Sequence, residues 1–293
     1  MSLIRPLLQD RAFLQDVRDA AAEAVSGSLH FWWLGQSGFL LQWQGRHLLF
    51  DPYLSDSLTA KYAASDKPHV RMTARVVAPE KLDFIDAVTS SHSHTDHLDA
   101  ETLGPLLAMN PGLRLVIPEA NRAFVADRLG CDAEMPIGLD DGESARVGDF
   151  EFTGIAAAHE ELETDARGRH RFLGYVVRCG PWTVYHSGDT VDYGGLVERL
   201  KPFNVDVAIL PINGSRPERR VAGNLNGSEA AGLARAMSAK LAVPCHYEMF
   251  TFNTAPPEDF KAAAAALGQP VRVLRAGERC TVEKPVSEVV PSR

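Results

Sequence analysis

The chain has 293 residues, of which 45% are apolar, and its 30 Lys and Arg residues against 38 Asp and Glu residues give a formal net charge of −8. This composition is typical of a globular protein and excludes disordered and collagen-like chains. Because nucleic acids are bound mostly through clustered Lys and Arg, an acidic chain without a basic face is not expected to bind them. We expect one large domain rather than two small ones.

The sequence contains no run of about 18 apolar residues, the length that spans a bilayer. Its N-terminal segment is interrupted by Gln9, Asp10 and Arg11 before a signal-peptide core could form. We therefore expect a cytoplasmic protein without membrane insertion. The cysteines lie far apart and form no CxxC pair, which favours reduced thiols in a core over disulfides or a zinc knuckle. They are Cys131, Cys179, Cys245 and Cys280.

The N-terminal segment predicts an amphipathic helix. Asp10 is a suitable N-cap, and apolar residues then recur at helical spacing up to Gly27. The residues of this apolar stripe are Phe13, Leu14, Val17, Ala21 and Ala24. We expect residues 1–27 to pack as a helix on a single domain formed by residues 28–293.

Short aromatic and aliphatic runs then predict strands, with helices between some of them. Asn226 and Glu229 resemble a capping box at the start of one helix. The chain begins with a run of strands, continues with alternating strands and helices, and returns to strands. This order favours two sheets packed face to face with helices outside. The expected strands are 29–34, 37–43, 46–50, 83–90, 113–118, 150–158, 172–178, 182–187, 205–211 and 240–244. The expected helices are 100–109, 119–129, 192–201, 227–238 and 257–267.

The strongest chemical signal is the segment SSHSHTDHLD at residues 90–99, directly after the apolar run FIDAV. It contains an H-x-H-x-D-H pattern. Alternate residues of an extended segment point the same way, so His92 and His94 can chelate one divalent ion. Asp96 and His97 project around the following turn and can serve a second ion.

Two metal ions need more ligands than these four, and three suitable residues stand at the ends of predicted strands. They are His159, Asp189 and His246. Asp189 could bridge the ions because a carboxylate has two oxygens. The predicted ligands are His92, His94 and His159 for the first ion, and Asp96, His97 and His246 for the second, with Asp189 shared.

Motifs from about residue 32 to residue 255 resemble one superfamily. The strand with H-x-H-x-D-H, a lone His, SGDT and a second lone His are similar to the metallo-β-lactamase superfamily. WWLGQSGF, DPYLSD, GDT, PINGSR, GNLNGSEA and VPCHYEMF resemble its L-ascorbate-6-phosphate lactonase-like branch, a relative also of N-acyl-phosphatidylethanolamine phospholipase D. The resemblance implies an α/β fold, the four-layer αββα sandwich of two mixed sheets, with a two-metal site at one edge.

Ligands and resemblance together predict a metal-dependent hydrolase. Two ions would lower the pKa of a bridging water, so that hydroxide attacks a lactone or a phosphorylated sugar lactone. Asp96 would orient this hydroxide and receive its proton. His and carboxylate ligands suit Zn, Mn and Fe alike. The resemblance to the lactonase implies Mn beside Zn, so Zn and Mn are the expected ions and Fe is less favoured. The expected partner is a small anionic substrate, and a homo-oligomer is left open.

Other activities of the same fold are alternatives. A phosphodiesterase acting on a small phosphodiester or nucleotide could use the same ligands. A non-hydrolytic diiron oxidoreductase resembles this chain less, because that group carries Glu where His94 stands and usually includes a flavin domain. A non-catalytic interaction protein would have lost ligands, whereas all seven are present here.

Further candidates surround the expected centre. By the resemblance, Asp51 would hold a ligand histidine from behind, and a simple turn before Pro52 is the alternative. His186 is expected to be a buried, hydrogen-bonded residue. The alternative is that it supports a metal ligand, as proposed for Asp51. A basic cluster could hold an anionic substrate or lie on an exposed loop. It consists of Arg216, Arg219 and Arg220.

The remaining polar residues are predicted to be structural. Asp99 should cap the helix that follows it rather than bind metal. Cys245 should face the core, away from His246. Gly35-Gln36-Ser37-Gly38 is not a nucleophile elbow, because the strand-turn-helix context is missing. The isolated histidines are expected to be structural or solvated, and these are His30, His47, His69 and His170.

Overall fold

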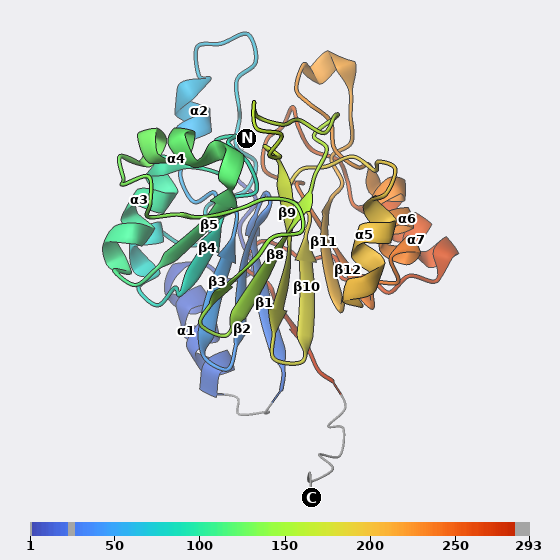
Figure 1. Cartoon of the computed structure of the whole chain (residues 1–293), viewed down its shortest axis with the longest axis horizontal. Coiled ribbons are helices and arrows are strands. Elements are labelled where there is room, and N and C mark those ends of the chain that lie inside the picture. The colour runs from blue at the N-terminus through green and yellow to red at the C-terminus, as the bar shows by residue number, and fades with distance from the viewer. Residues whose placement is uncertain (1, 23–26, 285–293) are drawn as a thin grey trace, which may run out of the picture.

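The computed structural model describes residues 2–22 and 27–284. Two β-sheets pack face to face in the middle of the molecule, and helices cover both outer faces (Figure 1). This arrangement confirms the predicted four-layer fold. Residues 23–26, which include the predicted helical residue Ala24, lie outside the described residues. The division into residues 1–27 and 28–293 stays a prediction.

In the described part of the chain, the first sheet has seven strands. Antiparallel pairs connect β13, β1, β2 and β3, and parallel pairs continue to β6. The order across this sheet is β13 (Arg279–Val282), β1 (Leu29–Gly35), β2 (Gly38–Trp43), β3 (Arg46–Phe50), β4 (Ala87–Thr89), β5 (Arg114–Pro118) and β6 (Ile137–Leu139).

The second sheet is also mixed and has six strands within the described ranges. Its order is β12 (Leu241–Cys245), β11 (Val207–Pro211), β10 (Trp182–His186), β9 (Leu173–Cys179), β8 (Phe150–Ala156) and β7 (Ser144–Val147). Strands β10, β11 and β12 run parallel, while β7 to β10 pair antiparallel. The parallel strands therefore send their C-terminal ends to the same edge.

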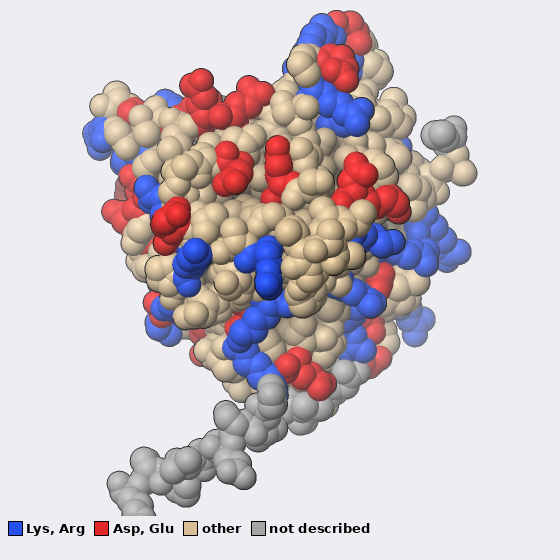
Figure 2. Space-filling view, turned by 90° about the vertical axis from the view of Figure 1, so that its right-hand side faces the viewer, with Lys and Arg blue, Asp and Glu red and all other residues tan. Residues whose placement is uncertain are grey.

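Helices cover the two sheets on opposite sides (Figure 1). The side of the first sheet carries α1 (Asp10–Ala22), α3 (Ala100–Met109) and α4 (Arg122–Leu129). The side of the second sheet carries α5 (Leu196–Leu200), α6 (Gly227–Ala236) and α7 (Glu258–Leu267). On this second side, Lys and Arg side chains are interspersed with Asp and Glu side chains (Figure 2). No helix in the described ranges is long and apolar enough to cross a membrane.

The two faces of strand β1 illustrate how the layers are held together. Trp32 packs edge-on against Phe13 of α1, with 6.3 Å between ring centroids, and donates its indole N–H to Asp16. The next residue, Trp33, turns to the opposite face and stacks on Tyr247 at 4.2 Å. Both faces of the strand are buried, which explains its continuous apolar run.

Most predicted elements are present with shifted ends. The capping box of Asn226 and Glu229 is confirmed at the start of α6. The expected strand 83–90 is shorter, because only residues 87–89 pair with neighbours. Asp99 is the N-cap residue of α3 as predicted, but its carboxylate accepts from Ser57 and Thr102 hydroxyls rather than from the backbone. The sequence analysis missed the short elements α2 (Ser57–Lys61), β6, β7 and β13.

The cysteines are free thiols. Cys179 and Cys245 are buried, as predicted for core residues. Cys131 and Cys280 are only partly buried, so the expectation of core thiols is wrong for these two. Cys131 follows the C-terminal end of α4. Cys280 lies on β13, an edge strand that has a neighbouring strand, β1, on one side only.

His47 in β3 is a buried histidine that is neutral in the folded protein. Its Nε2 lies 2.8 Å from Gln42 Nε2, and its ring packs edge-on against Phe84. Burial opposes the charged form and outweighs the attraction of Asp86, so the pKa of His47 is lowered to about 4. The ordinary value is 6.5, so below pH 6.5 the unfolded chain takes up a proton that the folded chain does not. Stability therefore falls as the pH drops from 6.5 toward 4.

Replacement of His47 by Gln should make the protein less sensitive to mild acid. Glutamine does not titrate, so between pH 7 and pH 5 the variant should lose about 2 kcal/mol less unfolding free energy than the wild type. Urea unfolding at the two pH values measures this difference. Equal losses in both proteins would contradict the lowered pKa of His47.

Candidate metal centre

The predicted metal ligands gather at one edge of the two sheets. The segment 90–99 follows strand β4, and His159 lies three residues after the end of β8. Asp189 and His246 follow β10 and β12, whose parallel directions place their C-terminal ends together. The structure thus brings all seven residues to one place.

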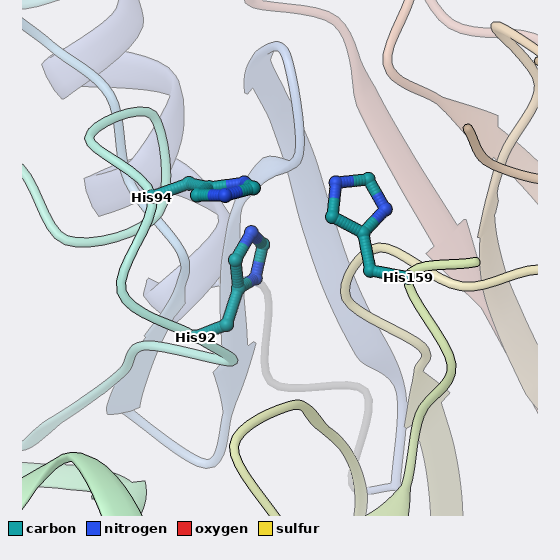
Figure 3. Close-up of side chains that lie close together, drawn as sticks. All are labelled: His92, His94 and His159. Atoms are coloured by element: carbon teal, nitrogen blue, oxygen red, sulfur yellow. The ribbon is translucent and has the colours of Figure 1, made fainter. Parts of the chain in front are cut away.

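The ligand atoms form three overlapping groups, and within each group all atoms lie within 4.8 Å of one another. In one group, the rings of His92 and His94 from a single loop and the ring of His159 from another loop surround a common space (Figure 3). The other groups are His92 with His97 and Asp189, and Asp96 with His97 and His246. We call His92, His94 and His159 the first half-site, and Asp96, His97 and His246 the second half-site.

Asp189 lies between the two half-sites. Its Oδ1 is 3.3 Å from His97 Nε2, and its Oδ2 is 3.4 Å from His246 Nε2, both in the second half-site. The same Oδ2 is 3.7 Å from His159 Nε2 in the first half-site. The carboxylate therefore faces both halves, which is the position that a shared ligand requires.

Asp51 supports the centre from behind. Its Oδ2 lies 2.7 Å from His97 Nδ1, and its Oδ1 accepts hydrogen bonds from Thr89 Oγ1 at 2.7 Å and Ser91 N at 3.1 Å. Because a carboxylate accepts, Nδ1 of His97 carries a proton toward Asp51 and its Nε2 faces the centre. The contact with His97 is the one that the resemblance implied for Asp51, and its role in metal binding stays a prediction.

The first half-site is oriented by backbone and hydroxyl groups. His159 Nδ1 lies 2.9 Å from the carbonyl oxygen of Gly223, so this nitrogen donates and Nε2 faces the centre. His92 Nδ1 lies 3.0 Å from Ser91 Oγ. Such contacts fix the ring orientation and leave the opposite nitrogen for a cation.

Burial and mutual attraction set the protonation of the centre. Burial lowers the pKa of His92 well below its ordinary value, which keeps this ring neutral. Burial also opposes a charge on His97, but the Asp189 and Asp96 carboxylates outweigh it and hold the pKa of His97 well above the ordinary value. Likewise, His97 and His246 outweigh burial at Asp189 and hold its pKa well below the usual range. The carboxylates therefore remain ionised and strongly attract positive charge.

Four of the seven candidate ligands have a buried side-chain atom without a hydrogen-bond partner within the described part of the chain. The atoms are His92 Nε2, His97 Nε2, Asp189 Oδ1 and His246 Nδ1. An unpaired buried polar atom costs about 1–3 kcal/mol, so several at one point need an explanation. Imidazole nitrogen and carboxylate oxygen are the donors that Zn, Mn and Fe accept. These residues fit a metal centre.

A pocket of about 330 Å³ leads to the centre. His94, Asp96, His159, Asp189 and His246 line its inner end. One side is formed by four rings, which we call the aromatic wall: Tyr62, His69, Phe250 and Phe252. Further lining residues include Leu58, Phe124 and the two cationic side chains Lys61 and Arg128.

His69 holds the aromatic wall together. Its ring stacks on Tyr62 at 4.2 Å between centroids and meets Phe252 edge-on at 4.5 Å. His69 Nδ1 lies 3.2 Å from the carbonyl oxygen of Lys67. The prediction of a merely structural or solvated histidine missed that His69 also lines the pocket.

None of the three arginines of the predicted basic cluster lines the pocket, although Val221 and Ala222, which directly follow Arg220, do. Arg219 is buried and donates to the carbonyl oxygens of Asn213 and Thr254, so it holds its own loop together. Arg220 forms an exposed ion pair with Asp66 at 2.8 Å. Arg216 is exposed. The cationic residues that the structure places at the pocket are instead Lys61 and Arg128, which no sequence motif indicated.

Two further polar residues lie near the centre. His186 is buried, its Nε2 lies 2.9 Å from the carbonyl oxygen of Ser37, and its ring stacks on Phe50. This agrees with the expected hydrogen-bonded residue. Gln36, by contrast, was not identified as a site residue, although it contacts Asp96 and His246. Its only signal in the sequence was its place in the WWLGQSGF motif.

Replacement of Asp51 by Asn should weaken metal binding while leaving the chain folded. An amide can still fill the space but cannot balance the proton on His97, so cation affinity should fall about 10- to 100-fold. Calorimetric titration of metal-free protein with Zn²⁺ or Mn²⁺ measures this. Asp206→Asn is the matched control, because Asp206 is also buried but pairs with Lys240. Unchanged affinity in Asp51→Asn would refute the supporting role.

Comparison with known proteins agrees with this geometry. The family model for the Beta-lactamase superfamily domain matches residues 46–247. Two solved structures share the fold at low sequence identity. A possible metal-dependent hydrolase from Veillonella parvula has a TM-score of 0.69 and 15% identity, and the match covers 88% of this chain and 100% of that chain. An isothiocyanate hydrolase from Delia radicum gut bacteria has a TM-score of 0.68 and 19% identity, with 87% and 100% covered.

Curated relatives match over nearly their whole length. A UPF0173 metal-dependent hydrolase of Opitutus terrae is 30% identical over 256 residues, which are 85% of this chain and 98% of the relative. One from Rubrobacter xylanophilus is 29% identical over 267 residues, which are 87% and 98% of the two chains. The chain therefore belongs to the metallo-β-lactamase superfamily and, within it, to the UPF0173 family of metal-dependent hydrolases.

Proposed function

We propose that this hydrolase uses two divalent cations, Zn²⁺ or Mn²⁺, to hydrolyse a lactone. The observation that carries the proposal is the convergence of seven imidazole and carboxylate side chains in two half-sites around Asp189, with five of the seven lining one pocket. When bound, the two ions would make a nucleophile from water at neutral pH and polarise the bond under attack. The chain's own groups then have distinct tasks.

Asp96 is the proposed proton acceptor. Unlike the fully buried ligands His97 and His246, its side chain retains 17% exposure, and it lines the pocket. Burial raises the pKa of Asp96, but His97 and His246 outweigh that effect and lower it, so the carboxylate is ionised and can accept a proton. Asp189 would hold the two half-sites at a fixed separation. The rings of His92, His94 and His159 would anchor the other side.

The pocket supports a small substrate with an apolar portion. The aromatic wall offers ring faces for a hydrocarbon or planar group, while the ligands at the inner end meet the scissile bond. Lys61 is an exposed cation that lines the pocket. Arg128 also lines it, but donates to the carbonyl oxygens of Ser93 and Leu98 and so holds the ligand loop. A phosphorylated lactone, as in the resembled lactonase branch, would place its phosphate near Lys61.

A substrate panel tests the proposed activity. Metal-loaded protein should hydrolyse some neutral or phosphorylated lactones, and metal-stripped protein should not. The panel should also contain small phosphodiesters, since such a centre can attack them too. Cleavage of phosphodiesters with no lactone hydrolysis would overturn the lactone proposal while retaining the metal centre.

Replacement of Asp189 by Ala should remove both cations together. The shared carboxylate faces both half-sites, so its loss should lower the metal content well below two ions and abolish hydrolysis. Elemental analysis of purified protein provides the count. Asp206→Ala, which removes a buried carboxylate elsewhere, should keep both ions. One ion retained at full occupancy with nearly normal activity would contradict the bridging role.

Replacement of Lys61 by Ala should affect charged substrates selectively. If Lys61 contacts a substrate phosphate, KM for a phosphorylated lactone should rise about tenfold, while kinetics on a neutral lactone should change little. Lys261→Ala on α7 is the charge-matched control, because Lys261 is exposed and outside the pocket lining. Equal effects on both substrates would indicate a structural role for the α2 segment instead.

A further inference from the structure

Gln36 is a fully buried polar residue in the turn between β1 and β2, directly beside the second half-site. Its side-chain Nε2 donates to Asp96 Oδ2 at 2.7 Å and lies 3.0 Å from His246 Nε2. Its Oε1 is buried without a hydrogen-bond partner among the described residues. Neither the fold nor the ligand set requires a glutamine here.

The chemistry of its neighbours fixes which way the amide points. An ionised carboxylate only accepts hydrogen bonds, so the amide atom that faces Asp96 is the nitrogen. That nitrogen has two hydrogens, one for Asp96 and one directed at His246 Nε2, which accepts it in the neutral tautomer that carries its proton on Nδ1. A single amide group therefore bridges two of the three side chains in the second half-site.

The bridge holds these two ligand atoms at a distance that suits a cation. Asp96 Oδ2 and His246 Nε2 are 3.7 Å apart. Two ligands on a tetrahedral ion with bonds of about 2.1 Å are separated by about 3.4 Å. We propose that Gln36 is a positioning residue that assembles the second half-site before its cation binds, an inference that rests on the proposed two-cation function.

The backbone of Gln36 is tied to the same site. Its carbonyl oxygen accepts hydrogen bonds from Trp33 Nε1 at 2.9 Å and from the backbone N–H of His246 at 3.0 Å. Gln36 and His246 both have positive φ, +51° and +63°, which non-glycine residues rarely adopt. The turn of the first sheet and the end of β12 in the second sheet are therefore locked together at the ligand. A side chain on this turn is held rigidly enough to position others.

Cation binding would change only one of the two amide contacts. A carboxylate oxygen can bind a cation and still accept a hydrogen bond, so the contact with Asp96 can persist. The single lone pair of His246 Nε2 cannot serve both, so the second amide hydrogen would be released into the site. Because supporting hydrogen bonds to ligands commonly contribute 10- to 100-fold to affinity, we expect the retained contact to dominate.

The test is calorimetric titration of metal-stripped protein with Mn²⁺ and, separately, with Zn²⁺. Gln36→Met removes the hydrogen bonds at nearly constant volume. Gln36→Asn keeps an amide and tolerates positive φ, but withdraws the amide by one methylene, so it guards against misfolding of the first variant. Gln42→Met is the matched control, because Gln42 is equally buried, also lies near a histidine ring nitrogen, and is remote from the ligands. The binding step lost in His246→Ala identifies the second half-site.

Both Gln36 variants should bind the second cation about tenfold or more weakly, with first-site affinity and the melting temperature of the metal-free protein close to those of Gln42→Met. Wild-type affinity at both sites would overturn the inference. A lowered metal-free melting temperature with equal losses at both sites would indicate that Gln36 only stabilises the fold, which also overturns it. A wild-type isotherm with a single ion would instead refute the proposed two-cation function.

Discussion

The buried contact between Asp51 and His97 is the interaction on which the position of the candidate ligand loop depends. Asp51 lies at the end of β3 and His97 in the loop after β4, so the contact ties the ligand loop to the first sheet. A fully buried carboxylate is costly without partners, and Asp51 has them in Thr89, Ser91 and His97. Because Asp51 accepts a hydrogen bond from His97 Nδ1–H, the opposite ring nitrogen is directed toward Asp189. This one interaction thus sets both the position of the His97 ring and the nitrogen that carries its proton.

Backbone conformations at the centre show the cost of this arrangement. Gln36, Asp51 and His246 are non-glycine residues with positive φ at the ligand edge. Gln36 contacts His246, and Asp51 contacts His97. Such conformations cost of the order of 1 kcal/mol or more each and persist only when surrounding packing enforces them. Two closely packed sheets provide that packing, since the strands leading into these residues are buried on both faces.

Chemistry and specificity come from different parts of the molecule. The ligands stand on strand ends and on the loop after β4, which are anchored in the core. The aromatic wall comes from the segments around residues 57–72 and 248–254, and Tyr62, Phe250 and Phe252 belong to a small hydrophobic cluster separate from the main core. Loops of this kind can vary while the centre stays the same. Family membership therefore defines a metal-dependent hydrolase, whereas pocket-lining residues such as His69 and Lys61 belong to these separate segments.

The sequence alone was sufficient to predict the sheets, most helices and the seven residues that meet at the centre. Hydrophobic period and turn residues act over a few neighbours, so elements such as β1 and α6 are readable directly. The H-x-H-x-D-H spacing is likewise a local pattern. The short strands β6, β7 and β13 were missed because three or four residues carry too little periodic signal, and only pairing with neighbours makes them strands.

Long-range contacts decided the rest, because their partners are distant in the chain and leave no local pattern. Gln36 reaches His246 across 210 positions, and the aromatic wall joins Tyr62 and His69 with Phe250 and Phe252. The basic cluster also shows that the sequence does not reveal which residues a side chain contacts. Its three arginines suggested a site for a substrate anion, but the sequence does not show where a charged side chain points. In the folded chain, Arg219 donates to carbonyl oxygens of neighbouring loops, and Arg220 pairs with Asp66 on the surface.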